Sequence, residues 1–422
     1  MLEQLEGSQA VARSVAMCRP EVIPAYPISP QTHIVEGLSA LVKTGALAPC
    51  EYINVESEFA AMSVAIGASA TGARAYTATA SQGLLYMAEA LYNASGLGLP
   101  IVMTIANRAI GAPINIWNDH SDAMSQRDSG WIQLYVESNQ EAVDTHMLAF
   151  RLAEEVSLPV MVCMDGYVLT HAVERLEMPA QEQVDAFLPP LEPRQLLDPA
   201  EPVTIGAMVG PEAFTEVRYL AHAKQMQALD LIPVLSEQLT QTLGRVQPAL
   251  VRGYRVEDAD TVVVALGSVL GTIEDVIDEL REERVSIGAL ALKAFRPFPL
   301  REVADALRGA KRIIVVERAF SVGMGGIVSQ DIRSALDATG GSAPTVYTVV
   351  AGLGGRPISK ASLRELFSEA IAGALHPVTF LDLDSGLVER ELERLRTSRR
   401  SGPHAENMIR DIGVVAARAV GG

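Results

Sequence analysis

Hydrophobic positions in the first half of the chain form short continuous runs separated by segments of helical period. The runs EVIPAYPI, RAYTATA, LPIVMTIAN and LPVMVCMD alternate with stretches such as QTHIVEGLSALVK and EAVDTHMLAFRLAEEV, in which apolar residues recur every three to four positions. Strands that are apolar without alternation are typical of parallel sheets covered by helices on both faces. The pattern therefore predicts a doubly wound α/β domain.

The same alternation returns near residue 261 and continues to about residue 350. TVVVALGS, VSIGALALK, KRIIVVER and PTVYTVV predict strands, and TIEDVIDELREE, REVADALRG and GIVSQDIRSALDA predict the helices between them. This predicts a second doubly wound domain. Between the two domains, the proline-rich residues 187–202 predict an irregular surface segment. The charge-rich tail from about residue 386 predicts either a solvated helix or an arm that contacts a partner subunit.

The stretch YPISPQT places Ser29 and Pro30 between a predicted strand and a predicted helix. Serine is a favourable N-cap and proline fits the first helical position, so we expect the helix to begin at Pro30. The first N–H groups of such a helix would face a crevice at the sheet edge together with the positive end of the helix dipole. This arrangement favours an anion.

Two charged residues are candidates for chemistry. Glu58 precedes a segment of small and apolar residues, so its carboxylate is expected to be partly desolvated and able to share a proton with a basic nitrogen. The alternative is a helix-end charge that complements the dipole. Arg108 ends the apolar run LPIVMTIANR, which places a guanidinium at the sheet edge where α/β proteins bind ligands. The alternative for Arg108 is an internal ion pair.

Composition excludes several classes of function. With 34 basic and 51 acidic residues the chain carries a formal charge of −17, which argues against nucleic-acid binding. No apolar run reaches the roughly 18 residues of a spanning helix, and the acidic N-terminus carries no signal-peptide core, so we expect neither a membrane nor a secretory protein. Cys18, Cys50 and Cys163 are too widely spaced to build a cluster by themselves, and they suit the cytoplasm.

Three motifs suggest sites but are better explained by structure. GMGGIV and GLGGRP fail the dinucleotide fingerprint because Val328 and Pro357 occupy the third glycine position. NDHSD, residues 118–122, brings two aspartates and a histidine together, but no further ligand cluster follows, and such loops commonly bond their own backbone. We therefore predict no metal site.

Seven motifs in order resemble the α subunit of 2-oxoacid:ferredoxin oxidoreductases, of the multi-subunit pyruvate type. They are GSQAVARSVAM, YPISPQT, ESEFAAMSVAIGAS, ATASQGL, NRAIGAPINIWNDHSD, MDGYVLTH and GLGGRP, and the resemblance extends from about residue 5 to AENMIRDIG near the C-terminus. It implies a thiamine-pyrimidine-binding-like domain at residues 1–250 and a transketolase C-terminal-like domain at 255–385. Residues 386–422 would form a C-terminal arm that contacts partner subunits.

The resemblance also assigns roles to residues of this chain. Glu58 corresponds to the carboxylate that bonds N1′ of the thiamine aminopyrimidine, and Ser29 and Arg108 correspond to the groups that meet the substrate carboxylate. Trp117 is expected to help shape the substrate pocket. The remaining expected cleft residues are Pro27, Ser81, Gln82, Gly83, Asn118 and Asp119.

Missing motifs indicate what other chains must supply. The sequence has no G-D-G motif for magnesium diphosphate and no C-x-x-C. The resemblance therefore implies a β subunit carrying the diphosphate, magnesium and a 4Fe–4S cluster, with γ- and δ-type subunits holding further clusters. Coenzyme A is the implied co-substrate, and electrons would pass to ferredoxin or an NAD-linked subunit. Pyruvate is the expected substrate, with branched-chain or aryl 2-oxoacids and 2-oxoglutarate as alternatives. A non-catalytic scaffold subunit is the alternative of another class.

Overall fold

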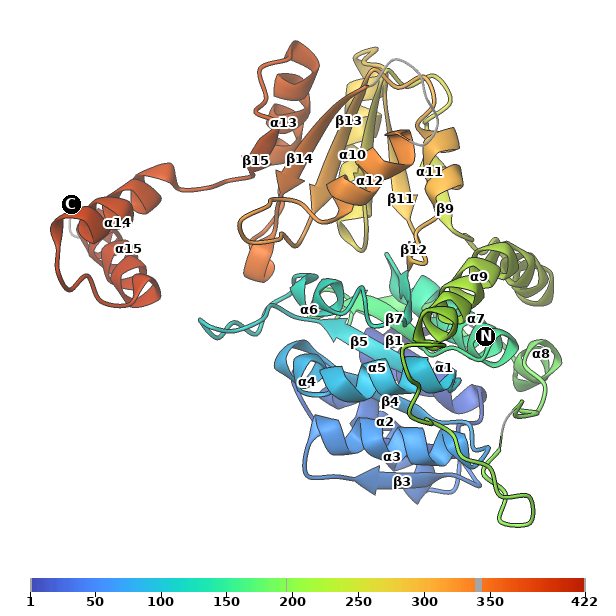
Figure 1. Cartoon of the computed structure of the whole chain (residues 1–422). Helices are drawn as coiled ribbons and strands as arrows, with labels where there is room; N and C mark the ends of the chain where they lie inside the picture. The colour runs from blue at the N-terminus through green and yellow to red at the C-terminus, as the bar shows by residue number, and fades with distance from the viewer. Residues whose placement is uncertain (1, 195, 338–343, 421–422) are drawn as a thin grey trace. The chain divides into compact units, whose positions relative to one another are not determined.

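The computed structural model describes residues 2–194, 196–337 and 344–420, and for residues 414–420 the backbone alone. The chain divides into two compact units, Met1–Thr379 and Phe380–Gly422. The first unit contains two large sheets with helices on their faces, together with two small two-stranded sheets (Figure 1). The α/β fold expected from the sequence is thus confirmed.

The first sheet has the strand order β12-β6-β7-β5-β4. Strands β4 to β7 run parallel, and every residue in them is buried, as the continuous apolar runs predicted. The elements up to the proline-rich segment are β1 (Leu2–Glu6), α1 (Gly7–Met17), β2 (Val22–Ala25), α2 (Thr32–Lys43), β3 (Glu51–Asn54), α3 (Glu58–Ala70), β4 (Tyr76–Thr79), α4 (Ser81–Tyr86), α5 (Ala88–Leu97), β5 (Val102–Asn107), α6 (Ser121–Ser125), β6 (Ile132–Tyr135), α7 (Asn139–Val156), β7 (Val160–Asp165), β8 (Val173–Glu177) and α8 (Gln181–Phe187).

The second sheet has the order β15-β14-β13-β10-β11-β9, in which β14, β13, β10 and β11 run parallel and β9 is antiparallel to β11. The second doubly wound domain predicted from the sequence is therefore present. The elements of this half are α9 (Phe214–Leu243), β9 (Val251–Tyr254), β10 (Thr261–Ala265), α10 (Val269–Glu282), β11 (Ile287–Leu292), β12 (Ala294–Arg296), α11 (Leu300–Ala306), β13 (Arg312–Glu317), α12 (Val328–Asp337), β14 (Thr345–Val350), the 3₁₀ turn η1 (Leu353–Gly355), α13 (Lys360–Ala372), β15 (Val378–Phe380), α14 (Ser385–Thr397) and α15 (His404–Val420).

The two faces of the first sheet carry separate hydrophobic cores. One core combines residues of α1, α2, α7 and α9 with one face of the sheet. The other combines α3, α4 and α5 with the opposite face and continues into the second sheet, so that Trp131 and Val262 belong to the same cluster. Strand β12 strengthens this junction, because it lies between elements of the second half in sequence yet pairs antiparallel with β6. The shared core and the shared strand make the first unit continuous.

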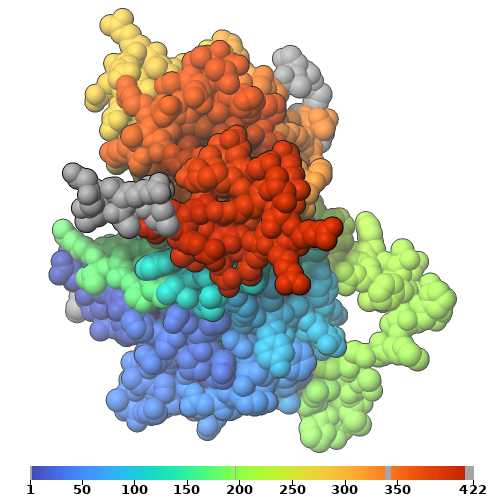
Figure 2. Space-filling view, turned by 90° about the vertical axis from the view of Figure 1, so that its left-hand side faces the viewer, coloured from blue at the N-terminus to red at the C-terminus, as the bar shows by residue number. Residues whose placement is uncertain are grey.

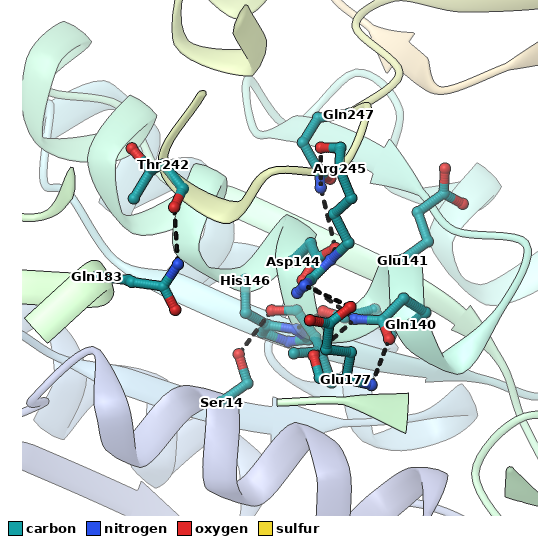
Figure 3. Close-up of polar contacts among 12 residues, drawn as sticks. Ser14, Gln140, Glu141, Asp144, His146, Glu177, Gln183, Thr242, Arg245 and Gln247 are labelled. Carbon is teal, nitrogen blue, oxygen red and sulfur yellow. Dashed lines mark hydrogen bonds and ion pairs between the residues drawn. The ribbon is translucent and has the colours of Figure 1, made fainter. Parts of the chain in front are cut away.

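Helix α9 was not foreseen, and a buried carboxylate attaches the segment after it to α7. Asp144 is 2% exposed and receives both Nε and Nη2 of Arg245, at 2.7 and 2.6 Å, and Nε2 of Gln247 at 3.0 Å (Figure 3). The side chain of Gln183 donates to the carbonyl of Thr242 at 2.8 Å in the same view. A bidentate arginine pair fixes geometry as well as adding energy. These contacts therefore set the direction of the chain as it enters the second half.

Beyond Phe187, where α8 ends, the described residues of the proline-rich segment form no helix and no strand other than an isolated bridge between Asp198 and Glu201. Most of its side chains are exposed, and Figure 2 shows this light-green part of the chain at the surface. The prediction of an irregular surface segment is confirmed. Across the described part of the chain, no helix combines the length and apolar character that crossing a membrane requires.

The second unit contains the two helices α14 and α15. Arg394 joins them, because its guanidinium pairs with Asp411 on α15 at 2.7 Å and with Glu391 on α14 at 3.1 Å. Arg390 also reaches Asp411, at 3.6 Å, so both Arg390 and Arg394 of the charge-rich tail pair within this unit. Residues 421 and 422 of the expected arm lie outside the described residues.

Candidate active site

The candidate site lies where β4 and β5 end side by side. The two strands pair in parallel with Thr79 opposite Ile105, so the segments that follow them start at the same edge of the sheet. After β4 come Ser81, Gln82 and Gly83, which begin α4, and after β5 comes Arg108. The carboxyl edge of a parallel sheet is where α/β proteins bind ligands. The structure thus brings together two of the motifs that the sequence singled out.

Glu58 is the first residue of α3, and the N-cap Ser57 fixes that helix start by accepting the N–H of Ala60 at 3.2 Å. The Glu58 residue is 8% exposed. Within the described part of the chain, no hydrogen-bond donor and no cation meets its carboxylate. The residue is therefore largely shielded by the protein while its carboxylate has no partner among the described residues, an unfavourable setting for a charged group. A role as a mere helix-end charge would not require this burial.

Gly83 is the residue against which the Glu58 carboxylate packs. A Cβ atom added at Gly83 would lie 2.7 Å from Oε1 of Glu58 and 2.5 Å from Oγ1 of Thr79. Both distances are shorter than a carbon–oxygen contact permits. Glycine is therefore required at this position so that the carboxylate can lie on the turn after β4. This gives a physical reason for the SQG motif.

Arg108 and Ser29 are in contact, but not through the groups that the sequence suggested. The guanidinium of Arg108 donates from Nη1 to the backbone carbonyl of Ser29 at 3.0 Å and from Nε to the carbonyl of Asn115 at 3.0 Å. Arg108 is 6% exposed and forms no ion pair with any described carboxylate, which leaves the Nη2 hydrogens without a protein acceptor there. The internal ion pair considered as its alternative role is not found among the described residues. Ser29 itself is exposed, and so is Pro27.

The expectation that Ser29 caps a helix beginning at Pro30 is wrong. Helix α2 begins at Thr32, and Gln31 holds the N-cap position without a side-chain cap bond. The side chain of Gln31 explains the delay, because its Nε2 donates to the carbonyls of Ala78 and Tyr26, at 2.7 and 3.2 Å. These bonds hold the chain against β4 in a turn before the helix can start.

Asp122 connects the two halves of the site and was missed as a site residue. Its Oδ2 accepts the backbone N–H groups of Ser81 and Arg108, both at 2.9 Å. Its Oδ1 accepts Nδ2 of Asn107 at 2.8 Å and the N–H of Ala123 at 2.7 Å. Burial raises the pKa of Asp122 to about 6, against the opposing effect of these donors. The only signal in the sequence was its place in NDHSD, where the carboxylate could have been suspected of holding backbone.

Ser81 and Gln82 face the interior of this turn. The hydroxyl of Ser81 donates to the carbonyl of Ala109 at 2.5 Å and also contacts Oε1 of Gln82. The amide of Gln82 occupies the space beside Gly111, where an added Cβ would lie 2.6 Å from Nε2. Ser81 therefore holds the loop after β5 in place, next to Gly83 and Arg108.

The NDHSD loop bonds protein groups, as the structural interpretation predicted. Asp119 accepts the N–H and hydroxyl of Ser121 through Oδ1, and its Oδ2 accepts the N–H of Gly354 at 3.1 Å. The glycines of GLGGRP therefore pack against the loop that contains NDHSD. An added Cβ at Gly355 would lie 2.4 Å from Cβ of Trp117, so a side chain there would not fit. Asn118 is 2% exposed, and neither polar atom of its amide has a hydrogen-bond partner among the residues that the structure describes.

His120 belongs to a buried network with the second half of the chain. Its Nε2 lies 2.6 Å from Oδ1 of Asp165, and Oδ2 of Asp165 accepts Nη1 of Arg318 at 3.0 Å and the N–H of Ser268 at 2.9 Å. Burial alone would raise the pKa of Asp165, but His120 and Arg318 hold it well below its usual range. This carboxylate is therefore charged and fully engaged, which explains the histidine without a metal.

In the other glycine-rich stretch, GMGGIV, the backbone N–H groups are bound by a side chain of the same chain. The carboxylate of Glu317 accepts the N–H groups of Ile327 and Val328, at 2.7 and 2.8 Å, at the start of α12. An added Cβ at Gly326 would collide with this carboxylate. The N–H groups that could hold a phosphate therefore hold a glutamate of the same chain.

Known proteins resemble this chain along most of its length. Residues 13–233 match the family described as "Pyruvate flavodoxin/ferredoxin oxidoreductase, thiamine diP-bdg", and residues 259–363 match "Pyruvate:ferredoxin oxidoreductase core domain II". The chain is 46% identical over 392 residues to the pyruvate synthase subunit PorA of Methanosarcina barkeri, which covers 91% of this chain and 97% of that one. It is 44% identical over 376 residues to the PorA subunit of Thermotoga maritima, with 87% and 94% covered.

Two further comparisons concern proteins that are named for other 2-oxoacids. The ketoisovalerate oxidoreductase subunit VorA of Pyrococcus abyssi is 38% identical over 390 residues, with 92% of this chain and 96% of that one covered. Among solved structures, a 2-oxoglutarate:ferredoxin oxidoreductase from Magnetococcus marinus aligns with a TM-score of 0.67 at 20% identity, covering 88% of this chain. This chain spans 65% of that protein's length. At this identity the likeness shows the fold.

Proposed function

The chain belongs to the pyruvate flavodoxin/ferredoxin oxidoreductase family as an α-type subunit, and we propose that it supplies the pyrimidine side of a thiamine-diphosphate site that oxidatively decarboxylates pyruvate to acetyl-CoA. The observation that carries this proposal is Glu58, a nearly buried carboxylate without a donor among the described residues, lying on the bare Cα of Gly83.

The residues present fit the pyrimidine end of this cofactor. A nearly buried carboxylate without a partner among the described residues is suited to share a proton with a ring nitrogen, and N1′ of the pyrimidine is such a nitrogen. Gly83 allows the Glu58 carboxylate to lie directly against the turn after β4. When bound, thiamine diphosphate supplies the electron sink that a 2-oxoacid needs in order to lose carbon dioxide.

Arg108 is suited to bind the carboxylate of the 2-oxoacid. Its guanidinium is nearly buried, its two described contacts are both neutral carbonyls, and its remaining Nη2 hydrogens have no protein acceptor within the described ranges. A buried cation without a counter-ion favours an anionic ligand. The exposed hydroxyl of Ser29 lies in the residue whose carbonyl Arg108 contacts, so we propose it as a second, weaker contact to the same carboxylate.

The remaining cofactors are proposed to come from other subunits of the complex. The sequence offers no G-D-G motif for magnesium diphosphate, and its three cysteines are free, with Cys18 and Cys163 buried. A β subunit would therefore bring the diphosphate site, magnesium and a 4Fe–4S cluster, with further clusters on γ- and δ-type subunits and coenzyme A as acyl acceptor. Ferredoxin, or an NAD-linked subunit, would receive the electrons.

Pyruvate is proposed over other 2-oxoacids because the PorA subunits are 46% and 44% identical to this chain, whereas the VorA subunit is 38% identical. The test is turnover of pyruvate, 2-oxoisovalerate, phenylglyoxylate and 2-oxoglutarate by the complex assembled with its partner subunits, with coenzyme A and a low-potential dye. Pyruvate should give the highest kcat/KM. A higher value for another acid would correct the substrate but keep the reaction.

The role of Glu58 is tested in the same assay by Glu58→Gln. The amide is nearly isosteric but cannot relay a proton, so turnover should fall at least about 100-fold. Glu56→Gln, at an exposed position two residues earlier, is the matched control and should leave turnover unchanged. Near wild-type turnover in Glu58→Gln would refute the catalytic assignment and favour a scaffold subunit.

A further inference from the structure

Two imidazoles and a carboxylate converge from three separate segments of the chain. Glu6 ends β1, His33 lies in the first turn of α2, and His171 lies between β7 and β8. One potential ligand atom of each lies within 4.8 Å of those of the other two. Oε1 of Glu6 is 2.7 Å from Nδ1 of His33, and the ring centroids of His33 and His171 are 4.9 Å apart. The proposed reaction uses none of these three residues.

Backbone pairing fixes the positions of these segments. Strands β1 and β8 pair antiparallel, with Glu6 opposite Val173. The next residue, Gly7, donates its N–H to the carbonyl of Ala172 at 3.0 Å, so the chain just after His171 is attached to the chain just after Glu6. The convergence is therefore a consequence of the strand pairing and not of long side chains meeting on a mobile surface.

The imidazole of His171 also has a partner on its other side. Oγ1 of Thr170 lies 2.8 Å from Nδ1 of His171 and accepts the N–H of Tyr167 at 2.8 Å. Histidines that bind metals usually have such a partner at the second ring nitrogen, which fixes the orientation of the ring. In His171 this leaves Nε2 as the nitrogen available to a ligand.

We propose that Glu6, His33 and His171 bind one divalent zinc ion, with solvent completing the coordination. Two imidazole nitrogens and one carboxylate oxygen are a ligand set that zinc accepts, and three protein ligands leave a fourth position for water. Bonds of about 2.0–2.1 Å in a tetrahedron separate the ligand atoms by about 3.3 Å. The distance between Oε1 of Glu6 and Nδ1 of His33, now 2.7 Å, must therefore increase slightly. Ligand atoms that lie farther apart than about 3.3 Å must move closer, and rotation of the side chains allows both changes.

The side chains have the freedom that this adjustment needs. The side chain of His33 is 44% exposed and that of Glu6 is 27% exposed, so neither is locked by packing. The ion would cross-link β1, the start of α2 and the turn before β8. An ion that binds the native state alone raises the melting temperature. We therefore infer a structural role, which does not depend on the proposed reaction.

The test uses the full chain, free of any affinity tag and stripped of metal with a chelator. Calorimetric titration with Zn²⁺ should show one ion per chain, and the ion should raise the melting temperature. His33→Ala and His171→Ala should each weaken binding at least tenfold and abolish the thermal shift, and Thr170→Val should weaken it about tenfold. Glu6→Gln, which is nearly isosteric, provides a ligand variant with minimal risk to folding.

His222→Ala is the matched control, because His222 is an exposed histidine on α9. It should bind Zn²⁺ as the wild type does. Circular dichroism establishes that each variant is folded before it is titrated. Absence of saturable binding in the wild type would overturn the proposal. Equal affinity in the wild type, Glu6→Gln and His33→Ala would overturn it as well, since the ion would then lie elsewhere.

Discussion

Replacing Asp122 with asparagine tests whether one buried carboxylate holds both parts of the candidate site. The residue is fully buried and accepts N–H groups from Ser81, Arg108, Asn107 and Ala123. Ser81 lies two residues before Gly83, against which the Glu58 carboxylate packs. Arg108 carries the guanidinium proposed to bind the substrate carboxylate. The substitution changes one atom and the charge while preserving shape.

The loss of folding stability in Asp122→Asn can be worked out from the hydrogen-bond acceptors that the substitution removes. Asparagine keeps one oxygen, which can face the N–H groups of Ser81 and Arg108. Its amide nitrogen would then face Asn107, whose own Oδ1 has no partner in the described part of the chain and could turn to accept it. The N–H of Ala123 would remain unsatisfied at a cost of about 1–3 kcal/mol, and two bonds would change from charge-assisted to neutral at about 1 kcal/mol each. We expect a loss of about 3–5 kcal/mol at neutral pH.

The pH dependence provides a second signature. Burial raises the pKa of Asp122 to about 6 from an ordinary value of 3.8, so the native state binds a proton that the unfolded state releases between these values. The free energy of unfolding of the wild type should therefore fall as pH rises from about 4 to 6. At about 1.4 kcal/mol per unit the change is on the order of 3 kcal/mol. Asp122→Asn lacks this contribution, so its deficit should be largest near pH 4.

The assay is denaturant unfolding of wild type and Asp122→Asn between pH 4 and 8, with steady-state kinetics of the assembled complex at neutral pH. KM for the 2-oxoacid should rise, because Arg108 loses part of its support. Asp128→Asn, whose side chain is 72% exposed, is the control and should change neither quantity. An equal dependence on pH in Asp122→Asn and wild type would refute the reasoning.

Three other predictions follow from the site. Arg108→Met should raise KM about 10- to 100-fold, as expected for a charge-assisted bond of about 1.5–3 kcal/mol, whereas Ser29→Ala should raise it less and leave the melting temperature unchanged, because Ser29 does not cap α2. An unchanged KM with a lowered melting temperature in Arg108→Met would exclude the substrate contact. Gly83→Ala should displace the Glu58 carboxylate and lower kcat without unfolding the chain, as checked by kinetics and circular dichroism. The chain purified alone should bind no stoichiometric iron and little magnesium–thiamine diphosphate, measured by iron assay and equilibrium dialysis.

The fold could be predicted from the sequence where the local pattern of apolar residues matches the burial of the strand that it forms. Continuous apolar runs became the buried strands β5 and β7, because a parallel sheet covered on both faces selects such runs. The strand β1, with sequence LEQLE, gave no such signal, and its partner β8 lies more than 160 residues away. Strand β12 joins a sheet other than that of its neighbours in sequence. Such non-local pairings are decided by tertiary packing and leave little trace in local pattern.

The residues proposed for the site could be singled out from the sequence, whereas their contacts could not. The end of a parallel strand placed Arg108 at the ligand edge, and the YPISPQT stretch singled out Ser29, but their contact through a backbone carbonyl has no sequence signature. The start of α2 was misplaced because Gln31 bonds β4, a tertiary contact that outweighs a favourable cap. Asp122 escaped notice because its four donors come from three different segments.

Glu58 and Arg108 have opposite charges, yet they do not neutralise each other. A chain of contacts joins them: Asp122 bonds Ser81 and Arg108, and Gly83, two residues after Ser81, supports the Glu58 carboxylate. Two nearly buried charges held at one sheet edge without partners among the described residues would destabilise a protein that had no ligand for them. The arrangement is explained if each charge meets a different group, a ring nitrogen for Glu58 and a carboxylate for Arg108. In the proposed function, a cofactor that presents its pyrimidine here has its diphosphate held by another subunit, because this chain carries no diphosphate motif.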